Sequence, residues 1–401
     1  MRVVQINSVC GEGSTGRIVS DLHNILIEHG HESYIAYGRN GSGNGGTAIR
    51  IGTNFDVYCH VAITRLFDAH AIGSRKATVR FVKRLSELKP DVIHLHNLHG
   101  YYVNIQVLFD YLKNSDIPVV WTLHDCWAFT GHCAHFINIG CNRWETQCHS
   151  CPQKKSYPKS EFIDRSRANH NMKRRLFSGV EKLTIVTPSG WLADLASKSF
   201  LKNYNIRVIP NGIELEIFRP TPSLFRSEYG LDDSFVILGV ASHWTKEKGY
   251  HFFMELSRHL NDGEVIVLVG LTEKQRRSLP ANVIGIGRLG ADELAKIYSA
   301  ADVFLNPTQA DTFPTTNLEA LACGTPIITF ATGGSGEAVG DGCGYVVDKG
   351  ALSEVVERIR EVSRKGKCSF TQHCIERARQ AYSKELRFRE YVRLYEELLN
   401  G

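Results

Sequence analysis

The chain contains no long apolar run. No stretch of its 401 residues approaches the roughly 18 consecutive apolar residues that a membrane-spanning helix needs. It also lacks low-complexity tracts, and its opening, Met-Arg-Val-Val-Gln-Ile-Asn, is strand-like and too polar for a secretory signal. These absences exclude an integral membrane protein and a disordered chain, and we therefore expect a cytoplasmic protein.

Strong compositional bias and short internal repeats are also absent. Apolar residues make up 43% of the sequence and charged residues 22%, as in an ordinary globular protein. A chain of 401 residues is longer than one hydrophobic core usually supports, so we expect two domains.

Charge is distributed unevenly along the chain. Residues 1–190 hold 22 Lys and Arg against 15 Asp and Glu (+7), whereas residues 191–401 hold 25 against 27 (−2). A basic half favours an anionic partner such as phosphate, an acidic lipid surface or nucleic acid, with a solvated basic face as the alternative. Residues 75–89 and 154–175 carry much of the excess, and as helices with basic faces either could rest on a membrane.

Short β-rich runs alternate with helical patterns along nearly the whole chain. Helical periodicity marks residues 17–29, 250–260, 291–300, 351–365 and 383–399. Strands are expected at residues 2–6, 33–36, 92–96, 119–123, 183–187 and 208–209, and in a second series at 236–240, 264–269, 283–286, 303–306, 327–330 and 344–347. Two such series predict two doubly wound α/β domains.

The expected domains are residues 1–187, with a cysteine-rich insert at 126–152, and residues 188–382. Prolines between residues 187 and 222 mark the junction, and a last helix at 383–401 could pack back on the first domain. In open α/β sheets, ligands bind beyond the carboxyl ends of the strands. Two such domains facing each other would place the active site in the cleft between them.

A glycine-rich turn, Gly11-Glu-Gly13-Ser14-Thr15-Gly16, follows the first expected strand and fits the pattern G-x-G-x-x-G. Such a turn lets a phosphate approach the N-terminus of the next helix, which is expected to open at Arg17. A nicotinamide-cofactor site would need an acid at the end of the second strand, where the sequence instead has Arg39. Because arginine suits a 2′-phosphate, an NADP-dependent oxidoreductase remains an alternative, as does a purely structural turn.

Two acids, Asp311 and Glu319, flank the start of a short expected helix that Gly324 ends. Two acceptors beside exposed helix N–H groups could hold sugar hydroxyls while the N–H groups hold a phosphate, which suits a nucleotide sugar. The alternative is a capping box, Thr316-x-x-Glu319, in which Glu319 only closes the helix N-terminus.

Other polar residues follow expected strands. Lys246 and Lys248, after the first strand of the second domain, could neutralise a diphosphate, although both could be ordinary exposed lysines. His124 lies at the carboxyl end of a strand and could donate to a sugar hydroxyl or a leaving oxygen, unless the backbone satisfies it. We interpret three further histidines mainly as packing and network residues: His94, His96 and His99.

Four closely spaced cysteines form an unusual pattern: Cys133, Cys141, Cys148 and Cys151. Disulfides are disfavoured in the cytoplasm, so four thiolates favour a structural zinc site that shapes a loop near His124. Ordinary or redox-active thiols are the alternative. A zinc-bearing nucleic-acid-binding protein is another, although no aromatic and basic recognition pattern accompanies the cysteines. The alternative zinc ligands are His132, His135 and His149.

Together these motifs resemble one family. Besides the glycine turn, the Lys248-Gly249 loop and residues 311–326, they include Pro90-Asp-Val-Ile-His-Leu-His96, Thr122-Leu-His-Asp125, Pro188-Ser-Gly-Trp191, Ile209-Pro-Asn-Gly-Ile213 and Gly333-Gly-Ser-Gly-Glu337. The chain resembles a retaining glycosyltransferase of family 4 over nearly its whole length. The resemblance implies the GT-B architecture, in which two Rossmann-like domains face each other across the active-site cleft. The cysteine-bearing run is similar to transferases of colanic-acid and related bacterial surface-polysaccharide pathways (exopolysaccharide, capsule or O-antigen).

The resemblance also implies a reaction. A UDP-, GDP- or ADP-sugar would donate a hexosyl group, with retention, to a lipid-linked oligosaccharide at the cytoplasmic face of the inner membrane. No catalytic metal and no nucleic-acid partner are expected.

The resemblance further implies roles at matching positions. Glu319 would bind the ribose, and Lys248 the diphosphate. Asp311 would hold the transferred sugar, and His124 would lie beside it. Gly13, Ser14, Thr15 and Gly16 would lie near the phosphates or the acceptor. The other expected donor-binding residues are His243, Arg288, Phe313, Thr315, Thr316 and Asn317.

Two positions depart from the family pattern. Family members usually carry glutamate where this chain has Asp311, and arginine where it has His243. Aspartate reaches less far, and histidine charges only partly at neutral pH, so Lys246 or an arginine of the first domain could assist with the phosphates. We interpret both departures as altered donor preference, with loss of activity as the alternative.

Overall fold

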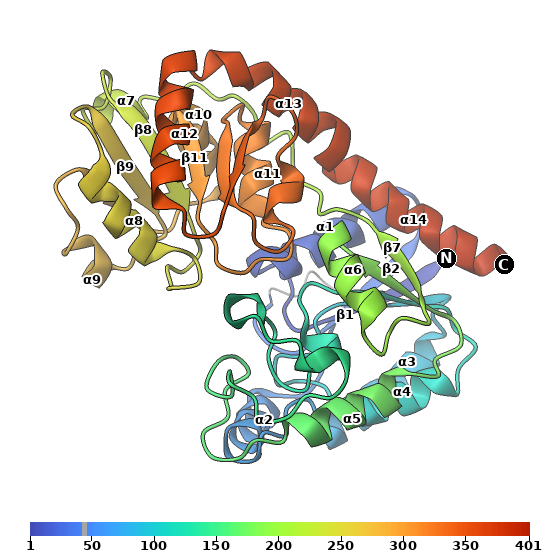
Figure 1. Cartoon of the computed structure of the whole chain (residues 1–401). Helices are drawn as coiled ribbons and strands as arrows, with labels where there is room; N and C mark the ends of the chain where they lie inside the picture. Colours follow the sequence, from blue (N-terminus) through green and yellow to red (C-terminus); the bar gives the residue numbers. More distant parts are fainter. Residues whose placement is uncertain (42–45) are drawn as a thin grey trace. The chain divides into compact units, whose positions relative to one another are not determined.

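The computed structural model describes residues 1–41 and 46–401. They form two compact units (Figure 1), one made of Met1–Ile209 with Phe388–Gly401 and the other of Pro210–Arg387. Among these residues, no helix combines the length and the apolar character that crossing a membrane requires.

The first unit is built on parallel strands in the order β3-β2-β1-β4-β5-β6-β7. The strands β4, β5 and β6 bury every residue, as expected for a parallel sheet covered on both faces. The strands are β1 (Arg2–Asn7), β2 (Glu32–Tyr37), β3 (Ala48–Arg50), β4 (Val92–Leu95), β5 (Val119–Thr122), β6 (Leu183–Thr187) and β7 (Asn205–Val208).

Helices cover both faces of this sheet because successive strand residues point to opposite sides. Val92 and Val120 pack with α1 and α14 on one face, while Ile93 and Val119 pack with α3, α4 and α5 on the other. The helices are α1 (Gly13–Glu28), α2 (Asn54–Phe67), α3 (Arg75–Leu88), α4 (Ile105–Lys113), α5 (Ser166–Phe177), α6 (Gly190–Lys198) and α14 (Lys384–Asn400).

The boundary between the units lies at Ile209 and Pro210, later than the expected boundary between residues 187 and 188. Strand β7 pairs in parallel with β6, with Thr184 opposite Asn205, and so extends the first sheet. Most residues of β7 are exposed, so this edge strand lacks the apolar pattern that marks a strand in the sequence. The short edge strand β3 was not predicted for a similar reason.

The last helix joins the first unit from Phe388 onward. Tyr391 and Tyr395 are buried in the core beneath the sheet. The Tyr391 hydroxyl lies 3.1 Å from Thr122 Oγ1, and the Tyr395 hydroxyl lies 2.6 Å from His94 Nδ1. The end of the chain therefore completes a core that begins with the first strand.

The second unit has the same winding, with parallel strands in the order β10-β9-β8-β11-β12-β13. Its strands are β8 (Phe235–Val240), β9 (Glu264–Val269), β10 (Val283–Ile286), β11 (Val303–Asn306), β12 (Ile327–Phe330) and β13 (Gly344–Val347). Its helices are α7 (Phe225–Glu228), α8 (Tyr250–Leu256), α9 (Glu273–Arg276), α10 (Ala291–Ala300), α11 (Thr315–Ala322), α12 (Leu352–Lys365) and α13 (Cys368–Tyr382).

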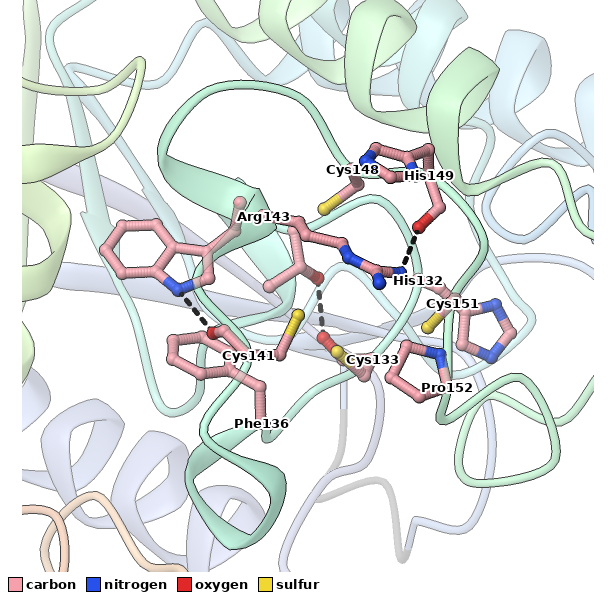
Figure 2. A pocket seen from close by; sticks show the side chains of 11 residues that line it. His132, Cys133, Phe136, Cys141, Arg143, Cys148, His149, Cys151 and Pro152 are labelled. Carbon is pink, nitrogen blue, oxygen red and sulfur yellow. Dashed lines mark hydrogen bonds between the residues drawn. The ribbon is translucent and has the colours of Figure 1, made fainter.

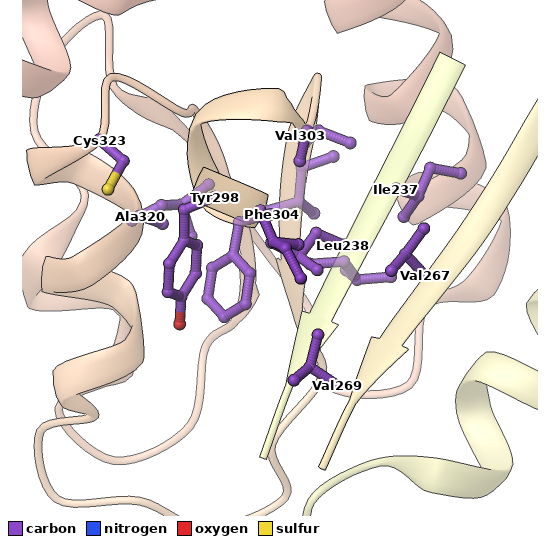
Figure 3. Packing of buried hydrophobic residues seen from close by; sticks show 14 of the residues in the cluster. Ile237, Leu238, Val267, Val269, Tyr298, Val303, Phe304, Ala320 and Cys323 are labelled. Atoms are coloured by element: carbon purple, nitrogen blue, oxygen red, sulfur yellow. The ribbon is translucent and has the colours of Figure 1, made fainter. Parts of the chain in front are cut away.

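The core of the second unit joins the central strands to α10 and α11. Figure 3 shows Leu238 of β8 and Phe304 of β11 beside Tyr298 of α10, all of them buried. Tyr298 and Phe304 meet edge to face, with ring centroids 5.4 Å apart. The packing holds α10 and α11 against the sheet, and α11 carries the acid that the sequence singled out.

Each sheet has one point where the winding reverses. In the first it falls between β1 and β4, and in the second between β8 and β11. Loops leave the carboxyl ends of the two neighbouring strands toward opposite faces there, which opens a crevice for ligands. The residues after β1, β4, β8 and β11 are therefore the positions to search for a site.

Candidate functional site

The ion pair of Lys248 and Asp311 lies at the reversal point of the second sheet. Lys248 follows β8 and Asp311 follows β11, the two strands that flank this point. Lys248 Nζ is 2.7 Å from Asp311 Oδ2, and the two side chains are 42% and 17% exposed. The carboxylate thus positions the lysine, which still reaches solvent where an anionic ligand can approach.

Close contact between two loops brings this pair together. Gly249 has a φ of +80°, and a Cβ there would lie 2.6 Å from Pro307 Cγ. Only glycine therefore lets the loop after β8 approach the loop after β11 so closely. The Gln309 N–H also donates to the Glu247 carbonyl oxygen at 2.7 Å, which joins the two loops beside the ion pair.

Glu319 is buried in α11, with 5% of its surface exposed. Its carboxylate accepts a hydrogen bond of 3.0 Å from the hydroxyl of Tyr298, which is fully buried on α10. A carboxylate accepts several hydrogen bonds, so Tyr298 can orient Glu319 without using all of its capacity. The sequence alone did not indicate Tyr298; its only signal is a polar tip on the apolar face of a helix.

The capping-box alternative for Glu319 is wrong. Helix α11 begins at Thr315, with Pro314 at the N-cap position, and the N-cap makes no side-chain hydrogen bond. Glu319 therefore lies more than a turn inside the helix, too far along to close its N-terminus. Proline fixes the backbone before the helix, so the start falls one residue before Thr316.

Arg288 lies beside the position where the family usually has arginine. Its Nη2 is 3.4 Å from His243 Nδ1, and its Nε donates to the Ser242 carbonyl oxygen at 3.2 Å. Both Arg288 and His243 are exposed, as is Lys246 on the same loop as His243. A permanent guanidinium charge from the loop after β10 therefore stands close to where the usual arginine would be.

The remaining expected donor-binding residues surround the start of α11. Thr315 and Thr316 are partly buried in its first turn. Asn317 is fully buried: its Nδ2 donates to the Ser335 carbonyl oxygen at 3.0 Å, and its Oδ1 accepts from Asn306 at 2.7 Å. Phe313 is buried as well. The side chains of Asn317 and Phe313 thus hold the helix start in place.

The glycine turn lies at the reversal point of the first sheet, after β1. The Gly11 N–H donates to the Gly16 carbonyl oxygen at 3.2 Å and closes the turn. Helix α1 begins at Gly13, so the expected start at Arg17 is wrong, and residues 13–16 form the first helical turn. Without side chains at two of these positions the helix can start inside the turn. The side chain of Glu12, the N-cap residue, does not cap the helix, so no N-cap side chain occupies its first N–H groups.

His124 and His96 stack at the carboxyl ends of neighbouring strands. Their ring centroids are 5.4 Å apart, and His96 Nδ1 lies 3.1 Å from His124 Nε2. Burial lowers the pKa of His124 to about 4, with a nearby Asp125 opposing the shift. Burial also lowers the pKa of His96 well below its ordinary value. Both rings are therefore neutral near pH 7 and can exchange hydrogen bonds with hydroxyl groups.

The other two histidines lie in hydrogen-bond networks. His99 Nε2 is 2.7 Å from Asp125 Oδ2. Burial raises the pKa of Asp125, but the nearby His99 lowers it more, so the pKa of Asp125 lies below its usual value. His94 Nε2 is 2.8 Å from Thr122 Oγ1. His96, the third histidine interpreted as a network residue, contacts His124 directly.

The four cysteines line one pocket, shown in Figure 2, which encloses a cavity of about 20 Å³. A hydrogen bond between Cys133 and Cys151 raises the pKa of Cys133 and lowers that of Cys151. The Gly131 N–H donates to Cys148 Sγ at 3.2 Å. Over residues 1–41 and 46–401, no group of three or more His, Cys, Asp or Glu side chains stands in an arrangement that would already hold a metal ion.

Two buried polar residues border the cysteines. His132 Nδ1 is 2.6 Å from Asp68 Oδ1, while its buried Nε2 has no hydrogen-bond partner in the described part of the chain. Lys173 donates to the Trp127 and Thr130 carbonyl oxygens at 2.6 and 3.0 Å. Burial lowers the pKa of Lys173 to about 7, although Cys148 and Cys133 oppose the shift. The sequence alone did not indicate Lys173. The feature that could have done so is a lysine at a position on the buried face of the helix α5.

Comparison with protein families identifies the class of this chain. The model for Glycosyl transferases group 1 matches residues 224–381, and that for Glycosyltransferase Family 4 matches residues 15–217. The two parallel-sheet units and these matches define a glycosyltransferase of the GT-B fold. The chain belongs to glycosyltransferase family 4, and the prediction from its motifs is confirmed. The match favours the transferase over the oxidoreductase and nucleic-acid-binding alternatives.

Individual proteins agree with this assignment. The chain is 27% identical over 417 residues to WcaC of Escherichia coli (strain K12), covering 99% of this chain and 100% of WcaC, whose name places it among glycosyl transferases of colanic acid biosynthesis. Sucrose-phosphate synthase from Thermosynechococcus elongatus superposes with a TM-score of 0.73 at 15% identity, covering 100% of this chain and 99% of that one. HepE of Anabaena in complex with UDP superposes with a TM-score of 0.69 at 14% identity, covering 99% and 100%. At these identities the two solved structures establish the fold alone.

Proposed function

We propose that the enzyme transfers a hexosyl group from a nucleotide sugar, with retention of the anomeric configuration. The observation that carries the proposal is the Lys248–Asp311 pair at the reversal point of the second sheet, with the carboxylate of Glu319 on the helix that follows. HepE, which shares the fold, has been solved with UDP and with UDP-glucose, and this supports a nucleotide sugar as the donor.

In this proposal the second unit binds the donor. Lys248 and Arg288 neutralise the diphosphate, and the backbone N–H groups of Thr315 and Thr316 at the start of α11 assist them. Glu319, oriented by Tyr298, accepts hydrogen bonds from the ribose hydroxyls. Asp311 does the same for hydroxyls of the transferred sugar. The positive charge stabilises the leaving diphosphate without a catalytic metal.

The first unit binds the acceptor in this proposal. The neutral ring of His124 donates to or accepts from a sugar hydroxyl, and the first turn of α1 lies near a phosphate of the acceptor or the donor. The likeness to WcaC over the full chain supports an acceptor from polysaccharide synthesis, and in this proposal the acceptor is carried on lipid. The enzyme would then work at the cytoplasmic face of the inner membrane.

A screen of donors tests the proposal. Purified protein is melted with UDP-, GDP- and ADP-sugars, with NADP and with an oligonucleotide, and donors that stabilise it are incubated with native lipid-linked acceptors. We expect stabilisation by one class of nucleotide sugar and a mass increase of one hexose on the acceptor. Stabilisation by NADP alone would overturn the proposal.

We also propose a structural zinc ion held by Cys133, Cys141, Cys148 and Cys151, with His132 as an alternative ligand. All five side chains line one cavity. Asp68 binds His132 through Nδ1, so the other ring nitrogen, Nε2, is not used by this hydrogen bond. The loops would have to close around the ion, since among the described residues no three potential ligands are already arranged to hold a metal. Metal analysis of purified protein is expected to find about one zinc per chain. A metal-free, fully active preparation would end the idea.

A further inference from the structure

Helix α2 (Asn54–Phe67) exposes its apolar side chains and buries its polar ones. The residues that it buries are His60 and Thr64. Phe55 is 74% exposed, Tyr58 71% and Phe67 51%, and Ile63 and Leu66 are exposed as well. A helix of a globular protein normally turns its apolar stripe toward the core. The folding of the first unit therefore does not account for these side chains.

The exposed residues of α2 form one continuous stripe. Positions 55, 58, 59, 62, 63 and 66 follow the spacing of three and four residues that places side chains on one face of a helix. His60, on the opposite side, accepts the Ala71 N–H at 3.0 Å through Nε2 and contacts Ser74 through Nδ1. These bonds fix the rotation of the helix, so the apolar stripe must point outward.

A loop beside α2 enlarges the apolar area. Phe162 and Ile163 are 71% and 41% exposed. The Glu161 N–H donates to the Arg65 carbonyl oxygen at 2.8 Å, which connects this loop to the end of α2. Figure 1 shows the green loop beside α2. We call the resulting area the α2 surface; it comprises Phe55, Tyr58, Ile63, Leu66, Phe67, Phe162 and Ile163.

Positive charge surrounds the α2 surface. Residues 54–67 and 154–167 contain six Lys and Arg against three Asp and Glu. The acids are engaged within the protein: Asp56 closes the capping box of α2, Glu161 pairs with Lys159 at 2.6 Å, and Asp164 accepts the Ser166 N–H at 2.8 Å. Besides the Lys159–Glu161 pair, the cationic side chains of Arg65, Lys155 and Arg167 are exposed. The rim of the α2 surface is therefore cationic.

We propose that the α2 surface docks on an anionic lipid bilayer, with its aromatic and aliphatic side chains among the acyl chains and its basic rim on the lipid phosphates. An apolar helix face with a basic rim has the chemistry of an interfacial helix. Self-association through the same face would bring two basic rims together, which disfavours a second copy as the occupant. The inference rests on the proposed function in one respect, since it explains how the enzyme meets a lipid-linked acceptor.

This surface takes its loop and most of its basic rim from one of the two segments that charge alone indicated, residues 154–175, but its apolar helix comes from outside both. Residues 154–165 do not belong to a helix, because α5 begins at Ser166. Helix α3 covers most of residues 75–89 and has its apolar face buried in the core through Phe81 and Leu85. Helix α2, which charge did not indicate because its sequence is mixed and weakly charged, presents the exposed apolar face.

Vesicle sedimentation of the purified full chain tests the inference. We expect binding to vesicles of equimolar phosphatidylcholine and phosphatidylglycerol, weaker binding at high salt, and little binding to phosphatidylcholine alone. The double variant Phe55→Ser/Leu66→Ser should lower the partition coefficient by about tenfold or more, because two apolar anchors are lost. Lys155→Glu/Lys159→Glu should do the same without changing the apolar area. Leu224→Ser is the matched control, since Leu224 is 72% exposed in the second unit.

The outcomes separate this inference from the proposed function. All substituted side chains are exposed, so the variants should keep the melting temperature and the nucleotide-sugar binding of the wild type. Equal binding to neutral and anionic vesicles, or unchanged binding of the Phe55/Leu66 variant, overturns the inference even if the donor screen succeeds. A concentration-dependent dimer in sedimentation velocity that the Phe55/Leu66 variant abolishes would also overturn it, and would assign the surface to a second copy.

Discussion

Lys248 Nζ lies 2.7 Å from Asp311 Oδ2, so a partly exposed lysine of the candidate donor site is paired with the less buried of its two acids. A diphosphate that binds Lys248 must share it with this carboxylate. The pairing therefore limits how tightly a nucleotide diphosphate can bind while keeping the lysine in place. The two residues form a unit, and they should respond differently when each is changed.

Lys248→Met should weaken the binding of a nucleoside diphosphate and lower kcat by about 100-fold or more, because one preorganised charge on the leaving group is lost. Asp311→Asn should strengthen nucleotide binding several-fold, since the competing carboxylate is neutralised, while kcat still falls. Calorimetric titration with the nucleotide and steady-state kinetics measure both effects. Equal weakening of nucleotide binding by the two variants would contradict the assignment.

Glu319→Gln keeps the shape of the side chain and an oxygen for the Tyr298 hydroxyl, but it removes the charge. We expect the affinity for the nucleoside diphosphate to fall about tenfold, the usual cost of losing a hydrogen bond to a charged group. Tyr298→Phe should cause a smaller loss, because it frees the carboxylate without removing it. Affinity for inorganic diphosphate is the control: it should not change in Glu319→Gln if this residue binds the ribose.

Arg288→Ala should raise the donor KM about tenfold, since a guanidinium contact to phosphate is lost. Lys246→Ala serves as the control and should leave KM nearly unchanged. In the Arg288→Ala background, His243→Arg should recover much of the loss, because the two positions are adjacent in space. If Arg288→Ala is inactive and His243→Arg does not restore activity in that background, Arg288 does not act by binding the donor phosphates.

Acid should destabilise the first unit as the pH falls from about 6.5 to about 4. Burial lowers the pKa of His60 to about 4, and its Nε2 accepts the Ala71 N–H, so protonation breaks this bond. The pKa of His60 in the folded protein lies below the unfolded value of about 6.5, so the unfolded chain binds more protons in this range. Stability therefore decreases as the pH decreases. The contribution of His60 to the free energy of unfolding is fully present above pH 6.5, and below about pH 4 His60 causes no further loss.

Urea unfolding at a series of pH values measures this effect. His60 should contribute a loss of up to about 1.4 kcal/mol per pH unit in this range. His60→Gln can still accept the Ala71 N–H but cannot titrate, so its stability should depend less steeply on pH. Parallel curves for the wild type and His60→Gln would show that His60 does not carry the dependence.

Most of the fold could be predicted because central parallel strands are continuous apolar runs. The six strands of the second unit were expected almost residue for residue, from Val236 to Val347. Of the edge strands, β3 was not expected and β7 was expected only as residues 208–209, since an edge strand is held by backbone pairing and need not be apolar. The pairing of β7 with β6 is what moves the unit boundary to Ile209.

The candidate site could be predicted in its residues but not in its contacts. Lys248, Asp311, Glu319 and His124 stand after strands or on the following helix, where α/β sheets bind ligands. Their partners come from distant parts of the sequence, such as Tyr298 for Glu319 and Arg288 for His243. Periodicity carries no information about such pairs, because it reports only which side of an element is buried.

The sequence by itself determined the family, the two series of strands and the positions of the main polar residues, because each depends on residues close together along the chain. Only the tertiary structure decided that Lys248 and Asp311 form an ion pair and that α2 turns its apolar stripe outward. The physical reason is the same in both cases. Loop approach at Gly249 and the buried hydrogen bonds of His60 fix these arrangements, and both depend on atoms that folding alone brings together.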